Sequence, residues 1–217
     1  MPAQRASTVG LAALVCVSAL LVTACVTGDR PHFVEAADTR GTPVGDPAID
    51  AVLSRLEHPT APSFTAAYTI LTKFTGATSN ATVAVDVDRR SITIADIRFL
   101  VEGSRTGTCN VSTGQCSNSV DDARVSDIQV THEFYGDATA RRLRADAVRR
   151  IGATTASAAT VGGVAATCVS VPIANGVPIY CVFDNGVLAR LDHGDVTIEL
   201  VSFREGVDEQ AFLAVDA

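Results

Sequence analysis

Hydrophobic and polar residues change their spacing several times along this 217-residue chain. Residues 11–22 are almost entirely apolar, whereas residues 46–57 repeat apolar side chains at helical spacing. In the second segment these side chains share one face: Ile49, Val52, Leu53 and Leu56. Asp46 before Pro47 is typical of a helix start, and Pro59 is typical of an end. The pattern predicts a short amphipathic helix.

From Ser63 the apolar residues alternate with polar ones, which is the spacing of strands that bury one face. Four strands are expected, over residues 63–74, 81–88, 91–103 and 104–111. A turn is predicted over residues 76–80. The inward phase of the third strand slips near Ala95 and Asp96, and a β-bulge there is the simplest explanation.

The middle of the chain is predicted to be helical. Residues 119–129 favour a short helix, and a longer one is expected with Asp137 as N-cap and Gly152 just after its end. About five strands follow, joined by Gly-Gly, Asn-Gly and similar turns, so the chain should contain about 8–9 strands. This order excludes the strict alternation of a parallel α/β fold. We predict an α+β fold in which a curved antiparallel sheet packs on a few helices.

The first apolar run has the features of an export signal. Arg5 precedes it, and two small residues stand directly before Cys25. The four residues from Val22 to Cys25 resemble the lipobox of bacterial lipoproteins, whose cysteine receives a diacylglycerol and becomes the mature N-terminus. The resemblance implies that residues 1–24 are a cleaved signal peptide and that Cys25 is the lipidation site. The main alternative is an uncleaved spanning helix over residues 9–26.

Residues 25–45 are rich in proline, glycine and charge without periodicity, so a disordered tether is expected before a single domain over residues 46–217. Arg5 is the only charged residue before Cys25, so 16 of the 17 basic residues and all 24 acidic residues remain, a formal charge of −8. This balance argues against a nucleic-acid partner. Lys73 is the only lysine among many arginines and alanines, which is typical of a high-G+C bacterium such as an actinobacterium.

Six cysteines divide into three groups. Cys16 belongs to the signal, Cys25 is the lipidation site, and four remain: Cys109, Cys116, Cys168 and Cys181. An even number in an exported chain favours disulfides. Three pairings are possible, but turn residues between the members of each neighbouring pair favour 109 with 116 and 168 with 181. The spacings do not match zinc sites, so no metal is expected.

No motif for catalysis or for a cofactor is present: the chain lacks a nucleophile elbow, a P-loop and a zinc-protease helix. The four histidines are scattered, at His32, His58, His132 and His193. The predicted second helix carries five arginines: Arg141, Arg142, Arg144, Arg149 and Arg150. They are interpreted either as a contact for anionic head groups or as a solvated face paired with Asp137 and Asp146.

The order of the elements from Ser63 to Phe212 resembles the half-barrel of LolA/LppX-like lipoproteins, whose sheet wraps around helices and can enclose an apolar cavity. The resemblance implies a non-catalytic protein, anchored by lipid on the extracytoplasmic face of the cell membrane. It would bind or carry an apolar or lipid ligand, or scaffold an envelope partner. Candidate ligand contacts are the inward apolar residues: Phe64, Tyr68, Ile70, Phe74, Ile92, Ile94, Phe99 and Phe183. A solid core and, as a function, an envelope hydrolase are the alternatives.

Overall fold

The computed structural model describes residues 39–213 of the chain. These residues form one open antiparallel sheet of 11 strands, in the order β6-β5-β4-β3-β2-β1-β11-β10-β9-β8-β7. The strands are β1 Ser63–Thr72, β2 Ala77–Asp86, β3 Arg89–Ile94, β4 Ile97–Glu102, β5 Arg105–Asn110, β6 Cys116–Ser117, β7 Thr155–Val161, β8 Val164–Ser170, β9 Ile179–Phe183, β10 Leu188–Asp192 and β11 Val196–Glu205. The helices are α2 Pro47–Glu57, η2 Asp122–Ile128, α3 Asp137–Arg149 and η3 Glu209–Phe212.

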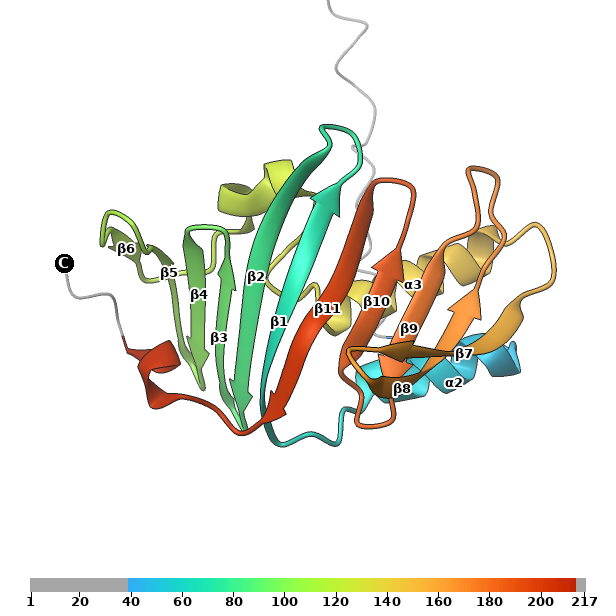
Figure 1. The fold of residues 1–217 in the computed structure, drawn as a ribbon, viewed down its shortest axis with the longest axis horizontal. Coiled ribbons are helices and arrows are strands. Elements are labelled where there is room, and N and C mark those ends of the chain that lie inside the picture. Colours follow the sequence, from blue (N-terminus) through green and yellow to red (C-terminus); the bar gives the residue numbers. More distant parts are fainter. Residues whose placement is uncertain (1–38, 214–217) are drawn as a thin grey trace, which may run out of the picture. The chain divides into compact units, whose positions relative to one another are not determined.

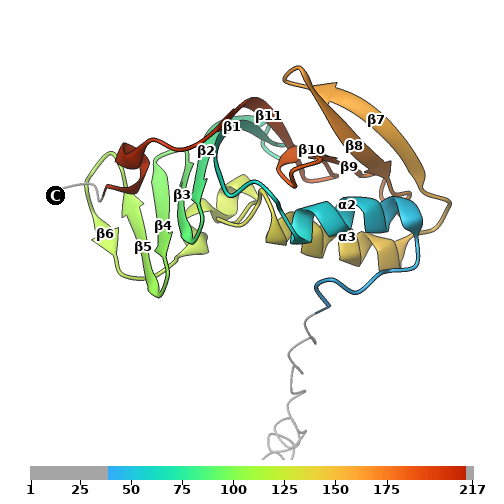
Figure 2. The ribbon, with the colours of Figure 1, turned by 90° about the horizontal axis from the view of Figure 1, so that it is seen from below.

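The first and the last strands of the chain, β1 and β11, pair with each other in the middle of the sheet. From this pair, successive hairpins lead to β6 at one edge and to β7 at the other (Figure 1). The sheet curves, and α2 and α3 lie side by side against the face of its β7–β11 half (Figure 2). We call this side the inner face; its apolar side chains include Tyr68, Ile70, Ile92 and Phe99, all at most 1% exposed.

The first helix is formed as the sequence predicts. The side chain of Asp46 accepts hydrogen bonds from the backbone N–H groups of Ala48 and Ile49, and Pro47 is the first helical residue. Its four apolar residues are at most 2% exposed against the sheet. Burial of side chains of this size stabilises the folded state by about 1.5–3 kcal/mol each. The helix is therefore held by its packed face as well as by its cap.

The sheet has 11 strands, and the expected number of about 8–9 was wrong for a specific reason. The phase slip at Ala95 and Asp96 is a two-residue hairpin turn, which leaves Ile94 and Ile97 directly opposite each other. Ala95 has a φ of 51°, a left-handed conformation that alanine rarely adopts. The third predicted strand is therefore two strands, and β6 adds one more. The first turn also comes earlier than expected, because β1 ends at Thr72 and β2 begins at Ala77.

The long helix differs from the prediction at both ends. Gly136, not Asp137, is its N-cap, and Asp137 is the first helical residue. At the other end Arg150 is already extended, and the N–H of Ile151 donates to the carbonyl of Pro172 at 2.9 Å. That backbone bond draws the chain out of the helix, so Arg150 is the C-cap and Ile151, which is 70% exposed, takes the position just after the end that was predicted for Gly152.

Both disulfides join neighbouring strands. Cys109–Cys116 links β5 with β6, and Cys168–Cys181 links β8 with β9. The favoured local pairing is the one present. No helix within residues 39–213 is long and apolar enough to cross a membrane.

Residues 40–45, which the sequence analysis assigned to the tether, make hydrogen bonds with both long helices. The N–H of Gly41 donates to Glu57 at 2.8 Å, and the N–H of Val44 donates to Asp50 at 2.7 Å. The carbonyl of Thr42 accepts from Arg144 at 2.7 Å. The described chain is thus attached to the domain from Gly41 onward.

Candidate functional site

The inner face contains most of the predicted ligand contacts. Seven of the eight are at most 3% exposed: Phe64, Tyr68, Ile70, Ile92, Ile94, Phe99 and Phe183. Phe74 is 95% exposed, so its predicted inward position was wrong. It lies two residues beyond the end of β1, in the turn that follows, where strand alternation no longer applies.

The segment 129–136, between η2 and α3, covers the central strands of the inner face. Phe134 is 2% exposed and packs edge-on against Tyr68, with 5.2 Å between ring centroids. Tyr135 makes the same kind of contact with Phe64 at 6.5 Å. The Tyr68 hydroxyl donates to the carbonyl of Leu188 at 3.0 Å. The segment therefore covers much of the aromatic surface, and the Tyr68 hydroxyl already has a partner.

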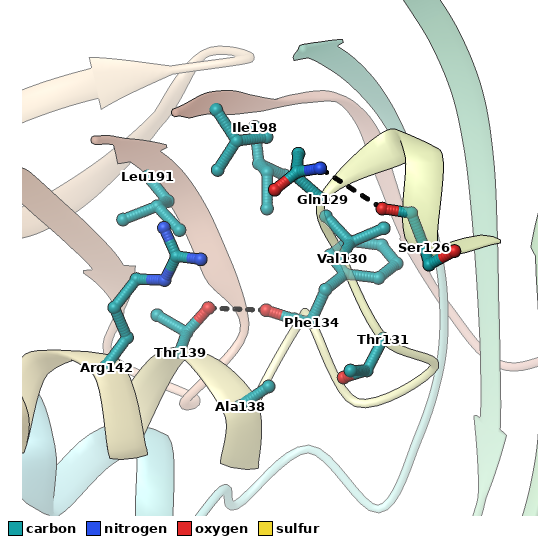
Figure 3. Close-up of a pocket in the computed structure, with 11 residues that line it drawn as sticks. Ser126, Gln129, Val130, Thr131, Phe134, Ala138, Thr139, Arg142, Leu191 and Ile198 are labelled. Atoms are coloured by element: carbon teal, nitrogen blue, oxygen red, sulfur yellow. Dashed lines mark hydrogen bonds between the residues drawn. The ribbon is translucent and has the colours of Figure 1, made fainter. Parts of the chain in front are cut away.

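Two small pockets remain on either side of this segment. The first, about 200 Å³, lies between residues 126–139 and the side chains of Leu191, Val196 and Ile198 (Figure 3). In Figure 3 the hydroxyl of Thr139 donates to the carbonyl of Phe134, and Gln129 donates to the carbonyl of Ser126.

The second pocket is also about 200 Å³ and has aromatic walls made by Phe64 and Tyr135. Arg90 and Glu133 lie at its polar rim. Burial raises the pKa of Tyr135 to about 12, so its hydroxyl stays neutral in any physiological buffer. Each pocket is smaller than the roughly 300–1,000 Å³ of typical ligand sites.

The arginines of α3 connect it to other elements and are not paired with Asp137 and Asp146, as one interpretation expected. Arg144 Nε lies 2.6 Å from Glu57 Oε1 of α2, and the two side chains are only 13% and 4% exposed. The other ion pairs run to different elements: Arg141 with Glu133, Arg142 with Asp195, and Arg150 with Asp46. Four of the five arginines thus have a carboxylate partner in another part of the chain, and the Arg144–Glu57 pair is the most buried of these.

A buried polar network lies between α3 and the β10–β11 turn. Asp146 is 1% exposed; its Oδ2 accepts from the Tyr180 hydroxyl at 2.6 Å and lies 3.3 Å from His193 Nε2. The other imidazole nitrogen lies 2.7 Å from Asp195, which also pairs with Arg142. Burial tends to raise the pKa of Asp146, but the hydrogen bonds from His193 and Tyr180 outweigh it and hold this pKa below its ordinary value. The bond with Asp146 raises the pKa of His193.

His193 also lines a groove of about 710 Å³ between the β8–β9 connection and the β10–β11 turn. Its charged walls are Lys73, Arg149, Asp192 and Asp195. In covalent catalysis a histidine base activates a serine, threonine or cysteine within hydrogen-bond reach. No serine, threonine or cysteine lines this groove, and both nitrogens of His193 face carboxylates. The network therefore resembles a structural tie more than an acid–base centre.

A second histidine has a carboxylate partner. Asp122 Oδ1 lies 3.0 Å from His132 Nδ1 and accepts the backbone N–H of the same residue at 2.7 Å. The ring of His132 stacks at 5.6 Å on Phe99 of the inner face. This pair supplies two members of a catalytic triad, but no hydroxyl or thiol of residues 39–213 hydrogen-bonds its other nitrogen. Within the described residues no group of three or more potential metal ligands is found.

The polar network around Asp146 was not predicted from the sequence. Asp146, Tyr180 and His193 lie on α3, β9 and the β10–β11 turn, and the separation of 34 residues between the first two gives no local signal. The packing of Phe134 and Tyr135 on the inner face was also not predicted, because the segment that carries them has no regular hydrophobic periodicity. Cys25 lies outside the described residues.

No protein-family model matches this chain, and no curated protein sequence matches it. Among solved structures, MucB is 14% identical with a TM-score of 0.47, over 78% of this chain and 64% of that one. The MucA/MucB complex of Pseudomonas aeruginosa gives 15% and 0.46, over 76% and 60%. A DUF1329 family protein from Desulfovibrio piger gives 10% and 0.36, over 77% and 98%. The chain thus spans 64% of the length of MucB. These values leave family and function open.

Proposed function

We propose that this protein is a non-catalytic, lipid-anchored module of the extracytoplasmic face that holds a protein partner rather than carrying a lipid. The observation that carries the proposal is the filled inner face. Seven of the eight predicted ligand contacts are at most 3% exposed, and the segment 129–136 packs on three of them, Phe64, Tyr68 and Phe99. The pockets lined by Phe64 and by Ile94 measure about 200 and about 310 Å³, at or below the lower end of the roughly 300–1,000 Å³ of typical ligand sites.

The two disulfides support a location outside the cytoplasm. Two disulfides are stable in an oxidising space outside the cytoplasm and are rare inside it. In this proposal residues 1–24 direct export, Cys25 carries the lipid and the residues after it lead to the domain. Two acyl chains are enough to anchor a protein stably, whereas one is not.

A lipid-binding test separates a scaffold from a carrier. Full-length acylated protein in mild detergent is titrated with a fluorescent fatty acid. The expected result is no saturable uptake, since the pockets lined by Phe64 and by Ile94 are at or below the lower size limit of typical ligand sites. Phe64→Trp provides a matched variant, because it would narrow the aromatic pocket further. Saturable uptake by the wild-type chain that Phe64→Trp reduces would overturn the scaffold proposal in favour of a carrier.

The anchor has its own test. Cys25→Ser should abolish labelling by a fatty-acid probe and cause the precursor to accumulate, because the acyl acceptor is the thiol itself. A spanning helix would respond to neither change, since serine at its end alters the apolar run very little. Wild-type protein that takes up no label but stays in the membrane fraction would contradict the lipid anchor.

The hydrolase alternative rests on one observation, the His132–Asp122 pair. It predicts that a panel of ester and amide substrates is cleaved by the wild-type chain and not by His132→Gln. We expect no cleavage by either, because no nucleophile of the described residues hydrogen-bonds the imidazole. Activity lost on that substitution would reinstate an enzyme.

A further inference from the structure

The two edges of the sheet differ sharply. At one edge β6 has only two residues and is tied to β5 by the Cys109–Cys116 bridge. At the other edge β7 runs for seven residues and pairs with β8 without any register shift. Among the described residues, no hydrogen bond outside the ladder with β8 involves the backbone of Thr155–Val161. One side of β7 therefore has unpaired N–H and C=O groups.

Sheet proteins normally protect such an edge with a charge, a proline, a bulge, a short strand or a covering element. Within residues 39–213, none of these is present at β7. The chain has no charged residue from Ile151 to Phe183, a stretch of 33 residues. The residues Thr155–Ala158 are all exposed, and Figure 2 shows β7 as the outermost strand at its end of the sheet.

The edge is also held rigidly. The Cys168–Cys181 bridge, 2% exposed at each cysteine, joins β8 to β9 one strand inward. At the tip of the hairpin, a Cβ built on Gly162 would lie 3.5 Å from the side chain of Leu200, so the hairpin is folded onto β11. Figure 1 shows β7 and β8 crossing in front of β9 and β10. A rigid edge loses little conformational entropy when another strand is added.

We infer that β7 pairs with the β7 strand of a second copy of this chain, antiparallel about a two-fold axis at Ala158. This inference rests on the proposed scaffold function and names the first partner. A two-fold axis normal to the sheet brings residues of the same face together around Ala158: Ser157 opposite Ala159, Ala156 opposite Thr160, and Thr155 opposite Val161. Every pair is small and uncharged, so nothing clashes or repels across the joint.

Charge favours contact between two copies at the β7 edge over contact at any other face. From Cys25 onward the chain carries a formal charge of −8, so two copies repel each other wherever acidic side chains meet. The uncharged stretch is where that repulsion is weakest. A pairing of seven residues alone makes a small interface, but tethering both copies to one membrane raises their effective concentration to about the millimolar range. The dimer should therefore form when the protein is anchored to the membrane.

Cysteine cross-linking in membranes tests the pairing and its register. Ala158→Cys, in the full-length anchored chain, should form an inter-chain disulfide, because opposed Cα atoms of antiparallel strands lie about 4.5–5.5 Å apart, within the range for a bridge. Two exposed alanines provide controls. Ala165→Cys lies on β8, away from the edge. Ala156→Cys lies on β7, but its symmetry mate would be about 13 Å away.

The expected result is about tenfold more dimer on a non-reducing gel for Ala158→Cys than for either control or the wild type, since only its bridge distance is satisfied. The wild-type lane accounts for any dimer through Cys16 or Cys25, and peptide mapping of the two native disulfides checks that each variant is folded. Equal cross-linking by all three variants, or by Ala156→Cys alone, would overturn the proposal.

This test and the lipid-binding test fail separately. Saturable uptake of the fatty acid would refute the scaffold without affecting the Ala158→Cys dimer. Absence of the dimer would refute β7 pairing and leave the scaffold with another partner.

Discussion

Asp146 of α3 and Tyr180 of β9 are joined by a hydrogen bond of 2.6 Å in a site where the carboxyl is only 1% exposed. The bond ties the long helix to the sheet, and His193 approaches the same carboxylate oxygen at 3.3 Å. A buried carboxylate is stabilised only as far as its partners compensate for lost hydration. Each donor should therefore contribute measurably to folding.

Removing the Tyr180 hydroxyl should destabilise the fold. Tyr180→Phe leaves Asp146 buried with one donor fewer, and a hydrogen bond to a charged group is worth about 1.5–3 kcal/mol. Urea denaturation of the two proteins measures the difference. Tyr135→Phe is the matched control, because no described residue hydrogen-bonds that hydroxyl, and it should cost less than about 0.5 kcal/mol. Equal losses in both variants would contradict the network.

The same network predicts how stability depends on pH. The pKa of His193 lies above its ordinary value of 6.5, so its contribution is fully present below pH 6.5 and is lost as pH rises through the raised pKa. The pKa of Asp146 lies below 3.8, so its contribution is present above that pH and is lost on further acidification. Arg142, Tyr180 and Asp195 surround the pair.

His193→Gln tests the alkaline limb. The free energy of unfolding of the wild type should fall as pH rises above 6.5 through the raised pKa of His193, and the variant should lose most of that slope because it has no imidazole at this position to titrate. His58→Gln, at the exposed end of α2, should keep the slope. A wild-type slope that persists in His193→Gln would assign it to another group.

The Arg144–Glu57 pair should be one of the costlier contacts to break. Arg144→Leu leaves the carboxylate of Glu57 buried, and breaking a buried pair costs about 3–5 kcal/mol. Replacing both residues by leucine should recover most of that loss, since no uncompensated charge remains. Arg141→Leu, whose arginine is 62% exposed beside Glu133, should cost less than about 1 kcal/mol. Denaturant unfolding of the four proteins gives the comparison.

Local chemistry explains which parts of the fold were predictable. The Asp46–Pro47 start of α2 and the two disulfide pairs depend on residues a few positions apart, so both are visible in the sequence. The Ala95–Asp96 turn was misinterpreted because alanine in a left-handed conformation carries no turn signal. The inward position predicted for Phe74 was wrong because the alternation of β1 was extended beyond Thr72, where the strand ends.

The site itself was less predictable. The alternation identified which residues face inward, but whether they line a cavity depends on what lies above them. Phe134 and Tyr135 fill that space from a segment without regular periodicity, about 65 residues after the strand they cover. Pairing partners of the α3 arginines, such as Glu57 for Arg144, are likewise distant in sequence. Tertiary contacts of this kind have no short-range pattern.

The two disulfides should differ in how easily they are reduced. Cys116 is exposed, whereas Cys168 and Cys181 are each 2% exposed. Thiol–disulfide exchange requires the attacking thiolate to reach a sulfur, so accessibility controls the rate when the fold stays intact. Limiting reductant without denaturant should open Cys109–Cys116 first. Isotope-coded alkylation followed by peptide mass spectrometry reads both bridges in one sample.

Removal of each bridge should then rank the two by stability. Closing a loop of sequence separation 13 restricts the unfolded chain more than one of separation 7, with contributions of about 3 and about 2.5 kcal/mol. The double substitution Cys168→Ala with Cys181→Ala should thus lower the unfolding free energy at least as much as the corresponding pair at Cys109 and Cys116. For the order of reduction under native conditions, the control is reduction in denaturant, where both bridges should open at similar rates because neither is buried. If Cys168–Cys181 were alkylated first under native conditions, the β8–β9 bridge would not be buried as described, and the rigid β7 edge would lose its support.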